Sequence, residues 1–349
     1  MKKKKRKVAI IFGGRSAEHE VSIISASSVY RNLDKKKFIP ISIYIDKKGL
    51  WRKVSSPFSK KDFRQKGNSF LPWKSSMKER INADIYFPLL HGPYGEDGTI
   101  QGLLEMENVP YVGTGILGSA LSMDKAKMKE IFRLKNLPVV DFEVIYDYQW
   151  SDKKDMILKI LERFLFPVFV KPSNLGSSVG ITKVKERENL ESAIEYAFRW
   201  DRKILVEQGI NAREIECSVL GNDNPISSIP GEVIPYREFY DYRDKYIEGK
   251  TKFEIPAKLS EEQIEEIKSL SILAYKSIEC SGMARVDFLM DRENEKIYLS
   301  EVNTIPGFTS ISMYPKLWEA SGIPYSQLIE RLIEYGFERF NKKKILCEY

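Results

Sequence analysis

Cysteine is scarce in this sequence. The three cysteines in 349 residues are Cys217, Cys280 and Cys347, and no two of them are spaced as zinc ligands are. Isolated thiols in odd number argue against a disulfide framework and favour a reducing compartment. We therefore expect a cytoplasmic protein.

Long hydrophobic runs are absent as well. No stretch reaches the roughly 20 apolar residues of a membrane span, and the run Val8–Phe12 is too short for the core of a signal peptide. Two nucleotide-binding signatures are also missing, namely the glycine pattern of dinucleotide-binding folds and the Walker phosphate loop. These absences argue against a membrane protein, a nicotinamide-dependent enzyme and a P-loop NTPase.

The basic charge of the chain is confined to one short segment. The formal net charge is +7, and residues 2–7 supply six of these charges, which leaves +1 for the remainder. Such a tail is able to bind nucleic acid or a membrane surface, but a solvated lead-in to the first strand is the simpler interpretation. We therefore expect neither nucleic acid nor a membrane as a partner.

The remaining composition is typical of a globular α/β protein. Apolar residues make up 42% of the chain and charged residues 30%, and 349 residues suffice for two or three domains. Val8–Phe12, Ile39–Ile45 and Ile85–Leu90 are short apolar runs, and residues 16–33 have helical spacing with Ser16 as a candidate cap. This order predicts a parallel βαβ sheet in the N-terminal third.

Two segments at strand ends of that sheet carry candidate site residues. Glu20 lies in the first helical turn, where its carboxylate either complements the helix dipole or holds the ammonium group of a substrate. Residues 91–102 are rich in glycine and begin with His91, one of only two histidines. A lone histidine is more often structural, but the position at a strand end favours a functional role.

The middle of the chain predicts a phosphate-binding loop. Residues 171–180, between two predicted strands, offer backbone N–H groups and hydroxyls to anionic oxygens. Lys171 begins this loop, and Lys125 lies on a predicted helix, Leu121–Leu137. Each lysine is either a phosphate ligand or a solvated surface cation.

Two further predicted strands carry acidic residues. Glu207 is near the end of the strand Ile204–Gln208, and Glu214 begins the strand Glu214–Leu220. A carboxylate at the edge of an apolar strand is suited to accept hydrogen bonds from an adenine amine or a ribose hydroxyl. Glu207 is therefore a candidate nucleotide ligand.

A predicted hairpin, residues 284–302, is the strongest candidate for a metal site. Glu301 and Asn303 are two residues apart, so their side chains leave one face of a strand, and Asp287 on the partner strand is able to face them. Oxygen ligands without His or Cys suit Mg²⁺, with water and a substrate phosphate completing its shell. Arg285 shares the face of Asp287 and adds a fixed cation. The alternative is an exposed hairpin with scattered charges.

The segment before this hairpin contains a predicted lid. Residues 235–256 hold several tyrosines without a clear period, which is typical of a functional loop. A helix over Ser260–Glu279 with Ser260 as its cap follows, and two helices around residues 314–321 and 325–341 come after the hairpin.

Seven motifs occur in a fixed order along the chain. They are GGRSAEHEVS (13–22), HGPYGEDGT (91–99), MDK (123–125), KPSNLGSSVG (171–180), REIEC (213–217), FYDYRDKY (239–246) and EVNTIPGFT (301–309). Together they make the chain resemble the D-alanine–D-alanine ligases of the ATP-grasp superfamily over nearly its whole length. The resemblance implies an α/β ATP-grasp fold with an N-terminal Rossmann-like domain (1–113), a central ATP-grasp subdomain (114–207) and a C-terminal ATP-grasp subdomain (208–349) that carries the lid and the metal site.

The resemblance also implies a role for each candidate residue in binding amino acid, nucleotide or metal. Glu20 would hold the ammonium of the first D-alanine and form a lid-closing network with Ser177 and Tyr246, Ser312 and Lys245 would hold the carboxylate of the second, and Arg285 and the Gly307 N–H would form an oxyanion hole, with His91 beside the substrate. The phosphates would be contacted by Lys125, Lys171, Lys245, Gly176, Ser177 and Ser178, and adenine and ribose would be held by Glu207 and Glu214. Two Mg²⁺ ions, for which Mn²⁺ would be a substitute, would be bound by Asp287, Glu301 and Asn303.

The implied activity is the ATP-dependent ligation of two D-alanine molecules through a D-alanyl phosphate, for peptidoglycan synthesis, by a homodimer. Tyrosine at position 246 is associated in the family with amine acceptors, and phenylalanine with D-lactate. Three alternatives stay open: a D-alanine–D-lactate ligase or other ATP-grasp carboxylate–amine ligase, a non-catalytic nucleotide-binding sensor, and a nucleic-acid-binding protein that uses the basic tail. Residues 58–78 fit the family least well.

Overall fold

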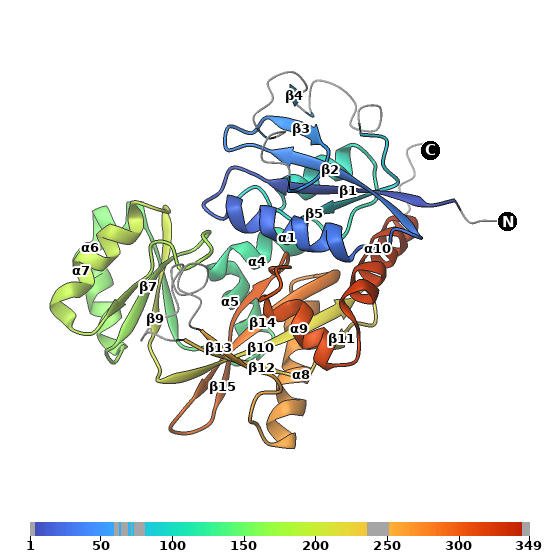
Figure 1. Ribbon diagram of the computed structural model, residues 1–349. Helices are drawn as coiled ribbons and strands as arrows, with labels where there is room; N and C mark the ends of the chain where they lie inside the picture. Colours follow the sequence, from blue (N-terminus) through green and yellow to red (C-terminus); the bar gives the residue numbers. More distant parts are fainter. Residues whose placement is uncertain are drawn as a thin grey trace, which may run out of the picture.

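The structure is a computed structural model that describes residues 4–58, 63, 69–70, 72, 81–235 and 251–343. These residues form three β-sheets, each with helices packed against it (Figure 1). The α/β architecture in three parts that the sequence predicted is confirmed.

The N-terminal sheet has parallel pairing around its first strand, as predicted. Its strands lie in the order β4 (Ser69–Phe70), β3 (Trp51–Val54), β2 (Phe38–Ile45), β1 (Arg6–Gly13) and β5 (Ile85–Pro88), and β1 is parallel to both β2 and β5. Helices α1 (His19–Asn32) and α10 (Tyr325–Lys342) cover one face and α3 (Thr99–Met106) covers the other. Coverage on both sides explains why Val8–Phe12 is a continuous apolar run.

The central sheet is antiparallel, and helices cover one of its faces more fully than the other. Its order is β6 (Phe142–Tyr146), β9 (Lys203–Gln208), β7 (Val168–Pro172) and β8 (Thr182–Val184). Helices α6 (Asp147–Ile160) and α7 (Leu190–Phe198) pack on its outer face (Figure 1). Along β7, Val168 and Val170 enter that core, so Phe169 and Lys171 project from the opposite face.

The third sheet is antiparallel and contains the predicted hairpin. Its strands are β13 (Lys252–Glu254), β12 (Gly231–Ile234), β10 (Ala212–Gly221), β14 (Gly282–Asp291) and β15 (Ile297–Asn303), with β11 (Ile226–Ser227) paired to β10. Helix α8 (Glu261–Ser277) packs on this sheet, and α9 (Met313–Ala320) packs near β12. Ser260 caps α8 through its hydroxyl, which confirms the predicted helix start.

Two helical segments pack across the predicted domain boundaries. Met128 and Phe132 of α5 (Lys125–Leu134) lie in the core of the third sheet, although the sequence predicted them in the central part. Leu328 and Leu332 of α10 lie in the core of the N-terminal sheet, although they are far from it in sequence. The boundaries at residues 113 and 207 stay predictions, and the cores show that the parts exchange segments.

The single helix predicted over Leu121–Leu137 is wrong. Helix α4 (Ile116–Met123) ends before Asp124, whose ψ of 91° is extended, and α5 begins at the next residue. The Asp124 carboxylate accepts a hydrogen bond from the Lys127 N–H at 3.1 Å, which makes it the cap of the second helix. The break therefore lies inside the MDK motif, and Asp124 causes it.

The cap predicted at Ser16 is also wrong. Helix α1 begins at His19 after Glu18, and the Ser16 hydroxyl instead donates to the carbonyl of His91 at 2.7 Å. The Ser16 hydroxyl thus connects the glycine-rich segment after β1 to the one after β5. Among the residues that the structure describes, no helix combines the length and apolar character that crossing a bilayer needs.

Candidate active site

A cavity of about 500 Å³ lies between the central and third sheets. The open face of β7, the loop between β7 and β8, the end of β9 and the hairpin β14–β15 all contribute to its wall. Most of the predicted nucleotide and metal residues line it: Lys125, Lys171, Gly176, Ser177, Ser178, Glu207, Glu214, Asp287 and Glu301. Side chains from motifs that are far apart in the sequence therefore line one cavity.

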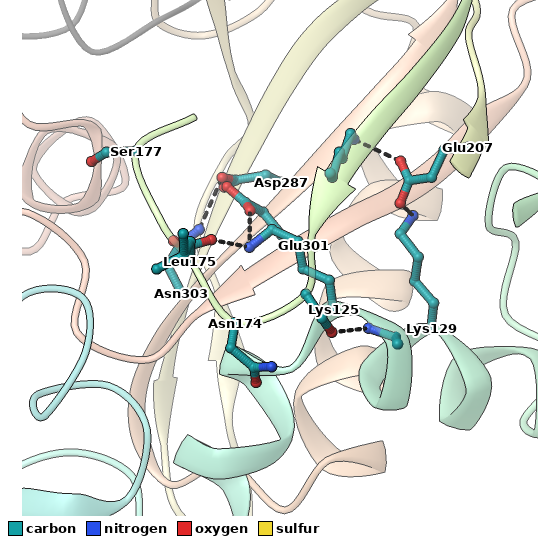
Figure 2. Close-up of polar contacts among 12 residues, drawn as sticks. Lys125, Lys129, Asn174, Leu175, Ser177, Glu207, Asp287, Glu301 and Asn303 are labelled. Carbon is teal, nitrogen blue, oxygen red and sulfur yellow. Dashed lines mark hydrogen bonds and ion pairs between the residues drawn. The ribbon is translucent and has the colours of Figure 1, made fainter. Parts of the chain in front are cut away.

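The hairpin places the predicted metal ligands together. Asp287 pairs in register with Glu301, and Arg285 pairs with Asn303. The Asn303 side-chain amide donates to Asp287 Oδ2 at 3.0 Å, so the two side chains share a face (Figure 2). The expectation that Asp287 faces Glu301 and Asn303 is confirmed.

Arg285 is fixed by two carboxylates. Its guanidinium donates to both oxygens of Asp287, each at 2.7 Å, and lies 3.0 Å from Glu216 Oε2. Burial works against the charged form of Arg285, but Asp287 and Glu216 hold its pKa well above the usual range. The site therefore contains a permanent cation beside the two acidic strands.

The donor set around Asp287 fits a divalent metal only in part. In the described chain, no three side chains of the His, Cys, Asp or Glu type gather as a metal-binding group. Asp287 and Glu301 supply two carboxylates, and Asn303 supplies an amide oxygen. Such a small set is what Mg²⁺ uses when substrate phosphate and water complete its shell.

Two predicted phosphate lysines border the cavity from different elements. The ammonium of Lys125 donates to the carbonyl of Leu175 at 2.6 Å and lies 3.8 Å from Glu301 Oε2 (Figure 2). The ammonium of Lys171 donates to Glu207 Oε2 at 2.6 Å. Neither lysine is a solvated surface cation, because their side chains are 11% and 14% exposed.

The serine loop between β7 and β8 reaches over to the N-terminal sheet. Ser177 and Ser178 both have positive φ angles, 51° and 59°, and both line the larger cavity. The Ser177 hydroxyl donates to Glu18 Oε1. This bond joins the central part of the chain to the segment that follows β1.

The structure corrects the expectation for Glu20. Its side chain is 67% exposed and lies 3.6 Å from Lys47, outside both cavities described in this section. Glu18, which is 9% exposed, is the carboxylate that meets Ser177. The correction follows from helix α1 starting at His19, which directs residues 18 and 20 to different sides.

A second, smaller cavity of about 80 Å³ adjoins the first. Glu18, His91, Arg285 and Gly307 line it together with Glu96. Glu96 accepts hydrogen bonds from the backbone N–H groups of residue 92 at 2.8 Å and residue 305 at 3.2 Å, and the sequence analysis missed it. Burial raises the pKa of Glu96 to about 8, and the charge of Glu18 adds to this.

His91 is held by contacts on both ring nitrogens. Nδ1 lies 3.0 Å from the carbonyl oxygen of Ile305, and Nε2 lies 3.0 Å from the Ser25 hydroxyl. A carbonyl accepts only, so Nδ1 carries the proton and Nε2 accepts from Ser25. Burial lowers the pKa of His91, which favours this neutral form.

Gly307 and Ser312 lie close together after the hairpin. A Cβ atom at residue 307 would lie 2.6 Å from Ser312 Oγ, so a side chain at this position would displace the Ser312 hydroxyl. The Ser312 hydroxyl accepts from the Thr309 N–H at 3.0 Å and precedes α9 as its N-cap residue. The N–H of residue 307 and this hydroxyl therefore belong to one tight turn at the rim of the smaller cavity.

Some predictions lie outside the described residues. Lys245 and Tyr246 are among residues 236–250, which also form most of the predicted lid. Much of the poorly fitting stretch 58–78 and Cys347 lie outside them too.

Two protein-family models match most of the chain. The model described as D-ala D-ala ligase N-terminus matches residues 7–114, and the model described as D-ala D-ala ligase C-terminus matches residues 131–334. The matched regions include the hairpin, the serine loop and the segment that holds Glu18.

Curated relatives and solved structures are similar over the whole chain. The D-alanine–D-alanine ligases of Caldicellulosiruptor bescii and Solibacter usitatus are 51% and 47% identical, with 97% and 98% of both chains covered. The structure of the D-alanine–D-alanine ligase from Coxiella burnetii has a TM-score of 0.85 at 37% identity, covering 97% of this chain and 95% of that one. The VanG D-Ala:D-Ser ligase from Enterococcus faecalis also has a TM-score of 0.85, at 36% identity, covering 95% of this chain and all of the other.

Proposed function

This chain belongs to the D-alanine–D-alanine ligase family, and from that membership we propose that it joins two D-alanine molecules at the expense of ATP, supplying a dipeptide for peptidoglycan synthesis. The observation that carries this proposal is the convergence of Asp287 and Glu301 with Lys125 and Lys171 around the larger cavity, with Arg285 bonded to Asp287 at the wall of the adjoining smaller one. Such a site combines lysine cations with carboxylates that suit Mg²⁺, and together these would offset the repulsion where two anions, a carboxylate and a triphosphate, must meet.

The larger cavity is the proposed nucleotide site. Lys125, Lys171 and the backbone of the serine loop would neutralise and orient the phosphates, with Glu207 and Glu214 towards adenine and ribose. The cavity volume of about 500 Å³ is in the range of small-molecule sites. Lys245 would join these groups from the predicted lid.

The smaller cavity is the proposed amino-acid site. Glu18 would hold the ammonium of the first D-alanine, and its bond from Ser177 would fix the carboxylate in place. Arg285 and the N–H of residue 307 would stabilise the oxyanion that forms at the carbonyl carbon. Ser312, with Lys245, would bind the carboxylate of the second amino acid, and His91 would support the wall between them.

The proposed reaction has two steps. A carboxylate oxygen of the first D-alanine attacks the γ-phosphorus of ATP, the bond to the bridging oxygen breaks, and ADP and an acyl phosphate form. The amine of the second D-alanine then attacks the carbonyl carbon, phosphate leaves with the bonding electrons, and the amine loses a proton. Water would destroy the acyl phosphate, so closure of the site is a chemical requirement.

We also propose that Asp287, Glu301 and Asn303 hold Mg²⁺, two ions in all, with Mn²⁺ as a substitute. The bound metal would neutralise phosphate charge during the first step. Glu301→Gln should lower turnover by about 100-fold or more, because the ligand loses its charge while the strand keeps its shape. The measurement is phosphate release at ordinary Mg²⁺ concentration.

The matched control for that variant is Glu293→Gln, in the exposed turn of the same hairpin. It should release phosphate at the wild-type rate. Near-normal turnover by a folded Glu301→Gln protein would remove Glu301 from the metal site.

The experiment that tests the activity is phosphate release from ATP and Mg²⁺ with D-alanine, with L-alanine and no amino acid as controls. Release only with D-alanine, with dipeptide in equal amount, is the expected result. Release with L-alanine would keep an ATP-dependent ligase but discard this substrate. Binding of ATP without release would favour a nucleotide sensor.

The acceptor needs a separate measurement, since a structural neighbour is a D-Ala:D-Ser ligase. D-serine and D-lactate are therefore offered beside D-alanine, and the dipeptide of D-alanine should dominate. Tyr246→Phe should raise ester formation with D-lactate, and an unchanged product ratio would exclude Tyr246 from acceptor selection.

A cytoplasmic homodimer, with neither nucleic acid nor a membrane as partner, completes the proposal. Light scattering of the purified protein tests the dimer. A steep salt dependence of DNA binding, lost on deletion of residues 2–7, would contradict the absence of a nucleic-acid partner.

A further inference from the structure

Two lysines converge on one buried carboxylate at the wall of the larger cavity. Glu207 Oε2 accepts from Lys171 at 2.6 Å, and Glu207 Oε1 lies 3.3 Å from the ammonium of Lys129. Glu207 is 2% exposed and Lys129 is 1% exposed, so this pair is among the most deeply buried in the molecule. Figure 2 shows Lys129 approaching Glu207 from helix α5.

The two lysines differ in their access to the cavity. Lys171 and Glu207 line it, whereas Lys129 does not. In the part of the chain that the structure describes, Glu207 is the one ion-pair partner of Lys129. Lys129 is therefore a fixed cation on the side of the carboxylate away from the cavity, and Lys171 is a cation on the cavity side.

The charges of this group do not cancel. Burial opposes the charged form of Glu207, but Lys129 and Lys171 outweigh it and hold the pKa at about 2. Burial also lowers the pKa of Lys129, which Glu207 opposes. One lysine would neutralise the Glu207 carboxylate. The group of Glu207, Lys129 and Lys171 therefore carries one excess positive charge until an anion enters the cavity.

We propose that Lys129 is a positioning residue that releases Lys171 for nucleotide binding. Its ammonium keeps the Glu207 carboxylate balanced, so Lys171 is able to exchange that carboxylate for the phosphates of ATP. This inference rests on the proposed function, in which Lys171 is a phosphate ligand. It gives Lys129 a role although it touches no substrate.

The physical reason is the cost of a buried unpaired charge. When Lys129 is present, Lys171 departs and leaves a balanced ion pair behind. When Lys129 is absent, the same movement leaves the buried Glu207 carboxylate without an ion-pair partner, which is strongly unfavourable. Lys171 then stays on Glu207, and the phosphates lose a cation.

The variant that tests this is Lys129→Met, which keeps the apolar stem and removes the charge. Its control is Lys127→Met on the same helix, where the lysine is half-exposed and pairs with Glu130. Calorimetry measures the Kd of Mg·ATP and of adenosine for each protein. We expect Lys129→Met to weaken Mg·ATP about tenfold or more and to leave adenosine within about twofold, since only the phosphates lose a contact. Lys127→Met should bind both ligands as the wild type does.

A second substitution separates this role from a general structural one. In the double variant Lys129→Met/Glu207→Gln no buried charge remains to hold Lys171, and the amide oxygen still accepts a hydrogen bond. Because Glu207 is itself a proposed adenine contact, the reference is the single variant Glu207→Gln, and the double variant should bind Mg·ATP within about threefold of that single variant. If Lys129→Met does not fold, the double variant carries the test by itself.

The outcomes distinguish the inference from the proposed function. Wild-type protein that binds no Mg·ATP overturns the proposed function and this inference with it. Wild-type binding together with unchanged Mg·ATP affinity in folded Lys129→Met overturns the inference alone. A double variant that is about tenfold weaker than Glu207→Gln also overturns it, because the defect would not come from the retained Lys171.

Discussion

Glu18 and Glu96 line the same small cavity, but they accept hydrogen bonds from different groups. Glu18 accepts from the Ser177 hydroxyl, and Glu96 accepts from two backbone N–H groups. Burial and the nearby charge of Glu18 favour the protonated form of Glu96, whose pKa rises to about 8. At neutral pH this carboxyl therefore differs from an ordinary surface glutamate.

The raised pKa of Glu96 predicts a pH dependence of stability. A raised pKa in the folded state gives stability that is present below the unfolded pKa, about 4.3, and lost as pH rises through the folded pKa. The wild type should therefore lose on the order of 4 kcal/mol between about pH 4.5 and pH 8 through this group. Glu96→Gln should remove that loss, which is measured as the unfolding midpoint against pH.

The control for this prediction is Glu266→Gln, an identical change at an exposed site of α8. It should reproduce the pH profile of the wild type. A Glu96→Gln profile that is parallel to the wild-type profile would show that Glu96 titrates as an exposed glutamate does.

The contrast between Glu18 and Glu20 gives a second prediction at this scale. Glu18→Gln should reduce kcat/KM for D-alanine by about 10- to 100-fold, because a charge-assisted contact to the substrate ammonium becomes neutral. Glu20→Gln should change it by less than about twofold, since that side chain pairs with Lys47 at the surface. The reverse order of the two variants would restore the original expectation for Glu20.

There is a physical reason why the sequence did not distinguish Glu18 from Glu20. Both lie in one motif, and residues two apart on a helix point in nearly opposite directions. The predicted cap was Ser16, but the observed helix begins at His19, so Glu18 precedes the helix and Glu20 lies in its first turn. The hairpin residues were predictable because a strand alternates by two, whatever its starting residue.

At the scale of elements, strong periodicity decided what the sequence was able to predict. The hairpin β14–β15 and helix α8 have clear patterns and end signals, and both were predicted. Helix α6 was not, because its buried residues are only Trp150 and Ile157, about two turns apart, and a non-helical residue, Lys153, interrupts it. The short strands β6, β12 and β13 were missed for the same lack of pattern.

The cap of helix α8 gives a prediction at this scale. Ser260 accepts from the N–H of Gln263 at 3.2 Å, and the Gln263 side chain accepts from the N–H of Ser260 at 3.0 Å. Ser260→Ala should destabilise the protein by about 1 kcal/mol, seen as a lower midpoint in thermal or denaturant unfolding. Ser260→Asp keeps a capping oxygen and should stay close to the wild type. Equal midpoints for all three proteins would show that the cap does not limit stability.

At the scale of the whole molecule, the cores of the N-terminal and third sheets are built from segments that are far apart in the chain. Helix α10 packs on the N-terminal sheet, and Arg6 lies over the ring of Phe337 with 4.5 Å to its centroid. Helix α5 joins the core of the third sheet and also contacts the central sheet through Ala126. Sequence patterns show which face of an element is apolar, but not which sheet receives it, so this exchange was not predictable.

The packing of α10 predicts a large effect of one remote side chain. Leu332→Ala should destabilise the protein by about 3 kcal/mol, because it leaves a cavity in the core that β1 also enters. Its neighbour Glu334→Ala, exposed on the same helix, should change stability by less than about 0.5 kcal/mol. The measurement is denaturant unfolding, and a loss near that of Glu334→Ala would place α10 outside the cooperative core.

The contact between β1 and α10 also bears on how the chain folds during translation. Strand β1 leaves the ribosome early, yet the residues that complete its core belong to α10, more than 300 positions later. Until α10 has been synthesised, the part of this apolar face that α1 does not cover lacks its partner in the nascent polypeptide. The central sheet, whose core comes from residues 145–206, is able to fold before then. Chaperones that shield exposed apolar surface would therefore be needed longest by the sheet that is made first.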